Sequence, residues 1–254
     1  MNTPHSTPPG KLFLVPAPLD FGCDAPVDLE QTMPKGTLAV VARLQHWVCE
    51  NAKSTRAYLK RVSDITPLAA PIQALNLLEL PRKVHSDRNF DARPLLQAAQ
   101  MGQDMGLVSE AGMPAVADPG SSVVRCAHEL GITVVPLVGP VSLLLALAAS
   151  GLNGQNFAFV GYLPQDSAAR VERIRALESL ALKTGQTQMF IETPYRNQAM
   201  MQSLLQTLHP LTRLAISSGL TLERASIHSD SVKNWQSRKA CLNNATPTVF
   251  AIGV

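Results

Sequence analysis

The sequence predicts an α/β protein, because strand-like and helix-like segments alternate along most of its length. Short apolar runs of strand length occur at residues 11–16 and 105–108. Residues 121–131 follow as a helix, with apolar side chains at helical spacing. Loops rich in glycine and proline separate such segments. Alternation of this kind is typical of sheets covered by helices.

The length of 254 residues is compatible with one or two domains. Residues 151–156, Gly-Leu-Asn-Gly-Gln-Asn, are short, polar and glycine-containing, which makes them the best domain boundary in the chain. We expect a disordered polar tail at 1–10, an α/β domain at 11–150 and a second α/β domain at 151–254.

The first half of the chain shows clear elements and two ambiguous segments. Residues 37–44 fit neither helix nor strand periodicity cleanly, and residues 66–94 contain four prolines. Ser54 or Thr55 is a candidate cap for a helix whose Tyr58, Leu59 and Val62 turn inward. The remaining elements are expected as a helix at 94–101, a strand at 105–108, a helix at 121–131 with serine at its cap, a strand at 133–137 and an apolar helix at 140–150, buried on most sides.

The second half alternates in the same way. Its elements are expected as strands at 157–160, 188–191, 214–218, 225–228 and 248–253, with helices at 167–180 and 195–208.

The most informative stretch is the loop that follows the strand at 105–108. It runs to Gly120 and carries two carboxylates, Glu110 and Asp118, among glycines and prolines. A strand, loop, helix and strand in this order form a crossover that places the two strands parallel in one sheet. Ligands of open parallel sheets bind beyond the carboxyl ends of the strands, where this loop lies. The sequence therefore predicts a ligand site here, with a simple chain turn as the alternative.

Composition excludes several classes of protein. The net charge of +3 permits a nucleic-acid partner without arguing for one, since no run of Lys or Arg occurs. The four cysteines are widely separated and have no metal-ligand spacing, so we expect reduced thiols in a cytoplasmic protein and no metal. The apolar run at 141–149 is too short to span a bilayer, and no membrane association is expected.

Four segments in order resemble the tetrapyrrole-methylase superfamily, most closely its branch of ribosomal RNA small-subunit methyltransferase I-like enzymes. Ser-Glu-Ala-Gly-Met-Pro-Ala-Val-Ala-Asp-Pro-Gly at 109–120 resembles the family's Ser-Asp-Ala-Gly-Thr-Pro…Asp-Pro-Gly segment. Residues 138–142 resemble its Pro-Gly-Pro loop, residues 161–164 its Gly-Phe-Leu-Pro segment, and residues 191–196 its Glu-Ser-x-x-Arg segment. The resemblance also favours a helix at 37–44 and a strand at 46–49. It departs from the family at 16–22, where the glycine-rich loop is largely replaced, and at 85–89.

This resemblance implies two α/β domains with a ligand cleft between them, a homodimer and S-adenosylmethionine as methyl donor. RNA or a ribosomal subunit is the implied acceptor, and ribose 2'-O-methylation of ribosomal RNA is the reaction by analogy. The donor site implied by the matching positions is formed by Pro16, Glu110, Ala111, Gly112, Met113, Val116, Val141, Ser142, Thr246 and Pro247. Met113 replaces a threonine of the family, which removes one hydroxyl that would bond the donor.

Substrate-side groups are also implied by the matching segments. They are Glu50, Arg56, Glu192 and Arg196. Glu192 and Arg196 stand four apart across a strand-to-helix turn, so a salt bridge between them is the alternative. Asp118-Pro-Gly reads as a turn and helix start in preference to a carboxylate near the donor's sulfonium.

Two other functions remain open on the sequence. One is methylation of a small molecule or a tetrapyrrole, which the mild charge permits. The other is a non-catalytic module that binds the donor, consistent with the altered loop at 16–22. An RNA enzyme should carry a basic face, for which the candidates are Arg43, Arg56, Lys60, Arg61, Arg82 and Lys83.

Overall fold

The computed structural model describes residues 8–20, 22–81, 84, 90–238 and 241–254. The chain divides into two compact units, one formed by residues up to 21 and 27–141, the other by residues 22–26 and 142–254. Each unit contains one five-stranded sheet. The predicted fold class, two α/β domains, is confirmed.

The first sheet is parallel and has the strand order β3-β2-β4-β1-β5. The strands are β1 (Lys11–Val15), β2 (His46–Cys49), β3 (Asn76–Glu79), β4 (Met105–Val108) and β5 (Thr133–Pro136). β4 and β5 both pair with β1 in parallel, which confirms the predicted crossover. Strand β3 falls in the proline-containing segment that the pattern left unassigned, and its pairing with β2 stabilises it.

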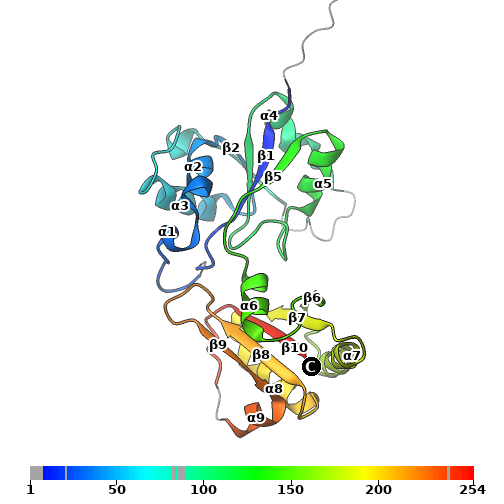
Figure 1. Cartoon of the computed structure of the whole chain (residues 1–254). Coiled ribbons are helices and arrows are strands. Elements are labelled where there is room, and N and C mark those ends of the chain that lie inside the picture. Colours follow the sequence, from blue (N-terminus) through cyan, green and yellow to red (C-terminus); the bar gives the residue numbers. More distant parts are fainter. Residues whose placement is uncertain (1–7, 21, 82–83, 85–89, 239–240) are drawn as a thin grey trace, which may run out of the picture. The chain divides into compact units, whose positions relative to one another are not determined.

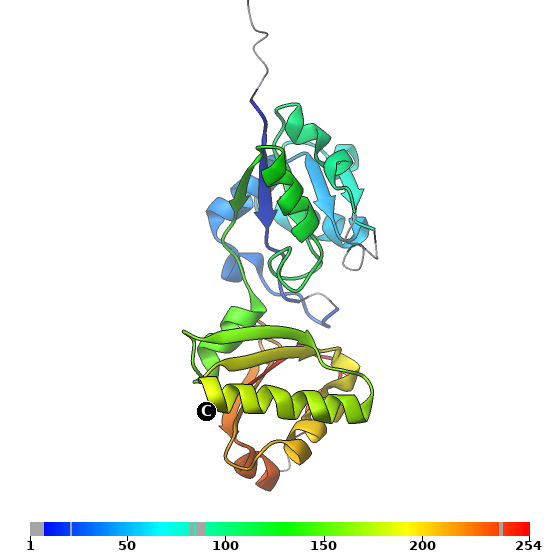
Figure 2. The same ribbon diagram turned by 90° about the vertical axis from the view of Figure 1, so that its right-hand side faces the viewer.

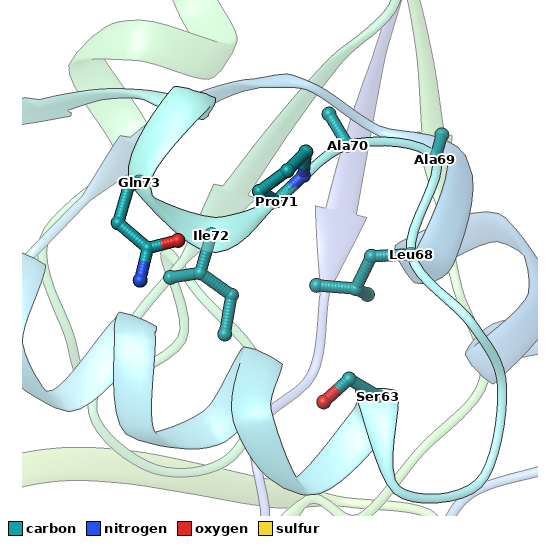
Figure 3. A pocket seen from close by; sticks show the side chains of 7 residues that line it. All are labelled: Ser63, Leu68, Ala69, Ala70, Pro71, Ile72 and Gln73. Atoms are coloured by element: carbon teal, nitrogen blue, oxygen red, sulfur yellow. The ribbon is translucent and has the colours of Figure 1, made fainter.

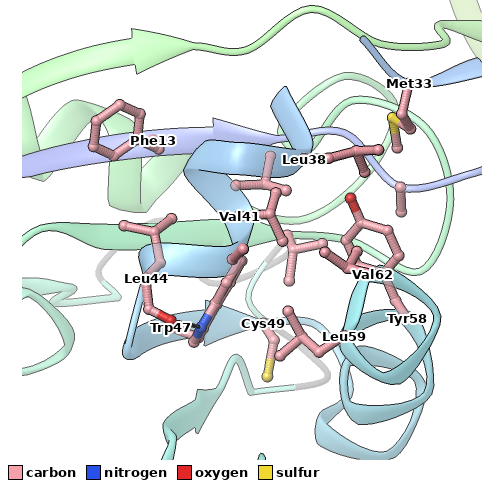
Figure 4. Packing of buried hydrophobic residues seen from close by; sticks show 14 of the residues in the cluster. Phe13, Met33, Leu38, Val41, Leu44, Trp47, Cys49, Tyr58, Leu59 and Val62 are labelled. Carbon is pink, nitrogen blue, oxygen red and sulfur yellow. Dashed lines mark hydrogen bonds between the residues drawn. The ribbon is translucent and has the colours of Figure 1, made fainter. Parts of the chain in front are cut away.

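Helices cover both faces of the first sheet, with α2 and α3 on one side and α5 on the other (Figure 1). Their bounds are α1 (Leu29–Thr32), α2 (Lys35–Arg43), α3 (Ala52–Ser63), η1 (Ile72–Ala74), η2 (Arg93–Leu96), α4 (Gln97–Gln100) and α5 (Ser121–Glu129). Side chains of β2, α2 and α3 converge in the core on one face, where Trp47, Val41 and Leu59 are fully buried (Figure 4). Gly106 in β4 lies against the Trp47 ring, since a Cβ there would stand 2.5 Å from the ring carbons.

The second sheet is mixed and has the order β6-β7-β10-β8-β9, with β6 and β7 parallel and the other pairs antiparallel. Its strands are β6 (Phe157–Tyr162), β7 (Thr187–Glu192), β8 (Arg213–Ser218), β9 (Ser226–Ser231) and β10 (Thr248–Gly253). The helical elements are α6 (Ser142–Ser150), α7 (Ser167–Thr184), η3 (Pro194–Arg196), α8 (Asn197–Thr207) and α9 (Val232–Ser237). Figure 2 shows α7 lying along this sheet, where it packs with α8 on β7 and β10.

Two predicted helix caps are wrong. The cap of α3 is Asn51, whose side chain accepts from the backbone N–H groups of Lys53 and Ser54. Ser54 and Thr55 lie inside the helix and donate their hydroxyls to the Asn51 carbonyl. At α5 the cap is Gly120 with φ 134°, which supplies no side chain. The inward face of α3 is confirmed, as Tyr58, Leu59 and Val62 are buried.

Helix α6 differs from its prediction in burial and in domain. Leu144 and Leu145 are 52% and 41% exposed, so only one face of the helix is buried. That face packs against β8, β9 and β10. The division between the units therefore falls before α6, between Val141 and Ser142, rather than at 151–156. Among the helices of the described residues, none has the length and apolar character needed to cross a membrane.

Candidate functional site

Four parallel strands of the first sheet end at one edge, and each leads into a loop of interest. Strand β2 leads to Glu50, β4 to the loop at 109–120, β1 to the loop at 16–20, and β5 to residues 138–141. Because parallel strands share their carboxyl edge, these four segments are neighbours in space although they are distant in sequence. The predicted location of the site at this edge is thus physically consistent.

A two-bond bridge ties the first loop to the long loop. The Ala17 N–H donates to the Gly112 carbonyl at 2.9 Å, and the Gly112 N–H donates to the Ala17 carbonyl at 3.0 Å. Gly112 has φ +68°, a backbone conformation that side chains with a Cβ rarely adopt. A Cβ there would stand 3.4 Å from Leu19 and 3.9 Å from the Pro140 carbonyl oxygen. Gly112 therefore joins three loops at the edge.

Pro16 and Gly139 pack against each other. A Cβ on Gly139 would lie 2.3 Å from the Pro16 ring, so glycine is required for this contact rather than for an approach to a ligand. Pro16 is buried, and its carbonyl accepts from the Tyr58 hydroxyl at 3.2 Å. These contacts show how Pro16 is held. Its contact with a donor stays a prediction.

Three carboxylates gather at this edge. The Glu50 carboxylate accepts from the Glu110 backbone N–H at 3.1 Å, and the Glu50 N–H donates to the Val108 carbonyl. Burial and the negative charge of Glu50 raise the pKa of Glu110, and a hydrogen bond from Ser54 partly offsets this. Burial, followed by the charges of Glu50 and Glu110, raises the pKa of Asp118 to about 7. The arrangement favours a cation that would neutralise it.

Asp118 lies in the turn that the sequence predicted, since Gly120 is the N-cap of α5 and the helix begins at Ser121. Its carboxylate accepts no hydrogen bond from the residues that the structure describes. The loop around it is strained, with Ala115 and Ala117 at φ 66° and 64°. The Ser109 hydroxyl is buried and has no hydrogen-bond partner among the described residues. The two carboxylates of this loop, Glu110 and Asp118, are the feature of the sequence that pointed to a site here.

Asp118→Asn is expected to stabilise the protein more strongly at pH 8 than at pH 5. The folded pKa of about 7 lies above the ordinary 3.8, so the stability that the protonated carboxyl contributes is present below pH 3.8 and lost as the pH rises to about 7. An asparagine stays neutral throughout and avoids this loss. Thermal unfolding at the two pH values measures it, with about 2–4 °C expected per kcal/mol. The exposed Asp64→Asn is the control, and an equal gain for Asp118→Asn at both pH values would contradict the prediction.

The predicted basic residues take different positions. Arg61 makes a two-pronged ion pair with the buried Asp20, at 3.1 and 2.9 Å, and so is not available to RNA. Arg43 pairs with Asp104 at 2.6 Å. Arg56 and Lys60 are exposed on α3. Arg82, Lys83 and the histidine-containing segment 85–89 lie outside the described residues.

The predicted residues of the second unit form a separate network. Arg196 and Glu192 pair at 3.3 Å with side chains only 19% and 2% exposed, so this is a buried bridge, not one at the surface. Beside it, the Asn197 amide donates to the carbonyls of Asn243 and Thr246 and to the Thr248 hydroxyl. The Pro247 carbonyl accepts from Gly219 N–H. Sequence reasoning did not identify Asn197, which links α8 to the start of β10.

The other residues predicted for the donor site lie on loops or at the start of a helix. Ala111 and Met113 are half-buried beside Gly112, whereas Val116 is 41% exposed. Val141 closes the first unit and Ser142 begins α6. A direct contact of these side chains with a donor stays a prediction.

Cysteine and metal chemistry find no support at this edge. Cys49 ends β2 next to Glu50, but burial raises the pKa of its thiol to about 11, so it stays protonated. Within the described ranges, no three His, Cys, Asp or Glu side chains are grouped to hold a metal ion. The expected absence of a metal remains an expectation.

Two cavities border the first unit. A shallow one of about 410 Å³ lies at the end of α3 and is lined by Ser63 and residues 68–73 (Figure 3). A larger one of about 730 Å³ lies at the carboxyl ends of β1 and β5 and includes Met113 and Val116 in its wall.

Comparison with curated proteins finds relatives described as ribosomal RNA small subunit methyltransferase I. The chain is 32% identical over 187 residues to "Ribosomal RNA small subunit methyltransferase I" of Pseudomonas aeruginosa, covering 74% of this chain and 58% of that protein. The protein of the same description from Leptospira biflexa is 32% identical over 177 residues, with 68% and 65% covered. That from Escherichia coli O157:H7 is 35% identical over 137 residues, with 54% and 46% covered. The chain thus spans about half to two thirds of the length of these relatives.

Solved structures share the fold at low sequence identity. The methyltransferase CobJ superposes with a TM-score of 0.57 at 18% identity, covering 96% of this chain and 94% of that one. Uroporphyrin-III-C-methyltransferase from Thermus thermophilus gives 0.54 at 17% identity, with 96% and 94% covered. No family model matches the chain. The predicted resemblance to tetrapyrrole methylases and to the ribosomal RNA branch is confirmed by these relatives and neighbours.

Proposed function

We propose that this chain is an S-adenosylmethionine-dependent methyltransferase that acts on RNA, with ribosomal RNA ribose 2'-O-methylation as the reaction. The observation that carries the proposal is the carboxyl edge of the first sheet, where the Ala17–Gly112 bridge joins two loops beside three carboxylates. The names of the relatives in the curated comparison support the reaction class.

The residues present fit the donor in two respects. S-adenosylmethionine presents a sulfonium cation, which supplies an activated methyl group when bound. Glu50, Glu110 and Asp118 provide the negative charge that such a cation requires, and a cation there would draw the raised pKa of Asp118 downward. The buried Ser109 hydroxyl, unpaired within the described residues, is an additional group able to donate to or accept from a ligand.

The role of this chain is then to hold donor and nucleophile in line, because methyl transfer is a displacement at an activated carbon. A ribose hydroxyl as nucleophile must lose a proton. Asp118 accepts no hydrogen bond from described residues, so we assign its carboxylate to receive this proton. We assign to Glu50 the role of holding Glu110 in position, through the hydrogen bond that its carboxylate accepts from the Glu110 N–H. The Glu192–Arg196 pair we assign to anchoring the start of α8.

RNA is favoured over a small acceptor by a basic row on α3. Lys53, Arg56 and Lys60 are exposed and stand three and four residues apart, so they share one face of the helix. The row begins one turn from Asn51 and Glu50, next to the carboxylates. A phosphate backbone lying along it would pass the proposed reaction site.

Replacing Lys53, Arg56 and Lys60 together by alanine is expected to weaken RNA binding and to flatten its salt dependence. Each phosphate contact of a single strand contributes about 0.7 to the slope of log K against log salt, so the slope should fall by about 2. Fluorescence anisotropy with a labelled RNA at several salt concentrations measures it. The triple alanine variant of Arg173, Arg175 and Lys183 on α7 removes the same charge from exposed positions elsewhere. Equal slopes for the two variants would contradict the proposal that the basic row on α3 contacts RNA phosphates.

The proposed function is tested by labelled-methyl transfer from S-adenosylmethionine to small-subunit ribosomal RNA, followed by nuclease digestion to locate the methyl group. Label in a 2'-O-methyl nucleoside supports the proposal. Donor binding without transfer to RNA, ribosomal subunits or tetrapyrroles would instead indicate a non-catalytic module. A cytoplasmic homodimer is part of the same proposal, and light scattering tests the dimer.

A further inference from the structure

The larger cavity of the first unit is an open hollow at the carboxyl ends of β1 and β5. Its volume is about 730 Å³. Its floor includes Leu14 and Pro136, which are register partners on the two strands. One wall is the segment Met113–Val116, and the other is α5. The volume lies within the range of small-molecule sites, about 300–1,000 Å³.

The α5 wall combines apolar and polar groups on one helix face. Ser121, Val124, Arg125 and His128 recur at spacings of three and four residues, so they line the cavity together. Arg125 is 65% exposed, and within the described part of the chain its one charged partner is Glu129, at 4.0 Å. Such an exposed pair at the distance limit is weak, and the guanidinium can turn to an anion.

We propose that this cavity receives a nucleotide of the acceptor RNA, with its base on the apolar wall and its phosphate at Arg125. The assignment to the acceptor rests on the proposed function. Proteins that modify or read RNA commonly take single bases out of the stack into a pocket. Val124, Met113 and Pro114 supply the apolar surface here, and the hydroxyl of Ser121 and the imidazole of His128 supply polar contacts.

The position of the cavity is compatible with a single RNA strand that also contacts the donor loop and the basic row on α3. Met113 follows Gly112 directly and Val116 lies four positions after it, so the cavity and the proposed donor site share one loop. In the order β2-β4-β1-β5, two to three strand spacings separate Glu50 from the cavity, about 10–14 Å. That is the length of a few nucleotides.

Charge argues against a tetrapyrrole as the occupant. Uroporphyrin-type tetrapyrroles carry many carboxylates, and each buried carboxylate requires a cationic or hydrogen-bonding partner. The cavity offers one guanidinium, that of Arg125, and the nearby Glu129 would repel further carboxylates. A nucleotide within an RNA strand brings a single phosphate charge, which one guanidinium can pair.

The test measures binding of a single-stranded RNA pentamer and of S-adenosylmethionine separately, by fluorescence anisotropy and calorimetry. Arg125→Ala is expected to weaken pentamer binding about tenfold, as for loss of one charge-assisted contact, and to leave the donor Kd unchanged. Arg175→Ala, an exposed helix arginine of the other unit, is the matched control. A pentamer containing 4-thiouridine should crosslink to peptides that span 113–136.

The proposal is overturned if Arg125→Ala behaves like Arg175→Ala, or if crosslinks map to α3 without any in 113–136. Parallel loss of donor binding in Arg125→Ala would assign the cavity to the donor and also overturn it. Failure of the proposed function looks different: the wild type would not bind S-adenosylmethionine, while pentamer binding would still depend on Arg125.

Discussion

Gly112→Val is expected to abolish binding of S-adenosylmethionine, with a loss of about a hundredfold or more in Kd. A β-branched residue at φ +68° is strained by about 1–3 kcal/mol, and the strain acts on the two hydrogen bonds that join Gly112 to Ala17. The Cβ itself would contact Leu19 and Pro140, so the valine methyl groups must displace the first loop or the loop after β5. Both loops border the proposed donor site. Calorimetry with the donor and its demethylated product measures the effect.

Gly131→Val is the matched control for this variant. Gly131 also has φ +68°, but no atom lies within 4 Å of its Cβ position, and it follows α5 at the opposite end from the loop. The two variants should lose similar thermal stability, since the backbone strain is the same. Only Gly112→Val should lose the donor. Equal donor binding by both variants would remove Gly112 from the site, and no donor binding by the wild type would contradict the methyltransferase proposal itself.

Arg61→Ala is expected to lower the free energy of unfolding by about 3 kcal/mol, the lower end of the cost of breaking a buried ion pair. The Asp20 side chain is 5% exposed, so removal of the guanidinium leaves a buried carboxylate with only the Val27 N–H as its described partner. Arg61 also donates to the Val27 carbonyl at 2.5 Å, so the variant removes two of the attachments of the loop after β1 to α3 and leaves the bond from Tyr58 to Pro16. Donor binding should weaken as well, because this loop carries Ala17. Urea unfolding and calorimetry measure the two effects.

Arg43→Ala provides the contrast within the same unit. Arg43 and Asp104 pair at the shorter distance of 2.6 Å, yet their side chains are 49% and 30% exposed. The guanidinium also lies 4.9 Å from the centre of the Phe13 ring. Solvent screening limits the expected loss to about 1 kcal/mol or less. If Arg43→Ala and Arg61→Ala cost the same, burial would not be what makes the Asp20–Arg61 pair important.

Elements with strong local signals were predictable from the sequence. Strands β4 and β10 have the predicted bounds, because apolar runs of strand length between polar or glycine-containing segments leave few alternatives. Strand β2 also has the bounds that the family resemblance favoured. The loop at 109–120 was identifiable as a candidate ligand site because two carboxylates and several glycines and prolines follow a buried strand. The resemblance to methyltransferases rested on the same residues.

Where the local sequence pattern is weak, contacts between residues distant in sequence decide which element forms. Strand β3 forms in a segment with little strand pattern because β2 offers it a parallel partner, and α9 was not predicted although Trp235 is buried and bonded to the Leu214 carbonyl. Helix α6 is apolar on all sides in the sequence, but only the sheet of its own unit determines which side is covered.

By itself, the sequence determined the alternation of strands and helices, the parallel crossover and the loop that holds Gly112 and Glu110, since these depend on local composition and spacing. Only the tertiary structure decided that Asp118 joins Glu50 and Glu110, that Arg61 is occupied by Asp20, and that Glu192 and Arg196 are buried together. The physical reason is that pKa, burial and ion pairing depend on neighbours brought together by the fold, 60 positions apart for Glu50 and Glu110 and 41 for Asp20 and Arg61.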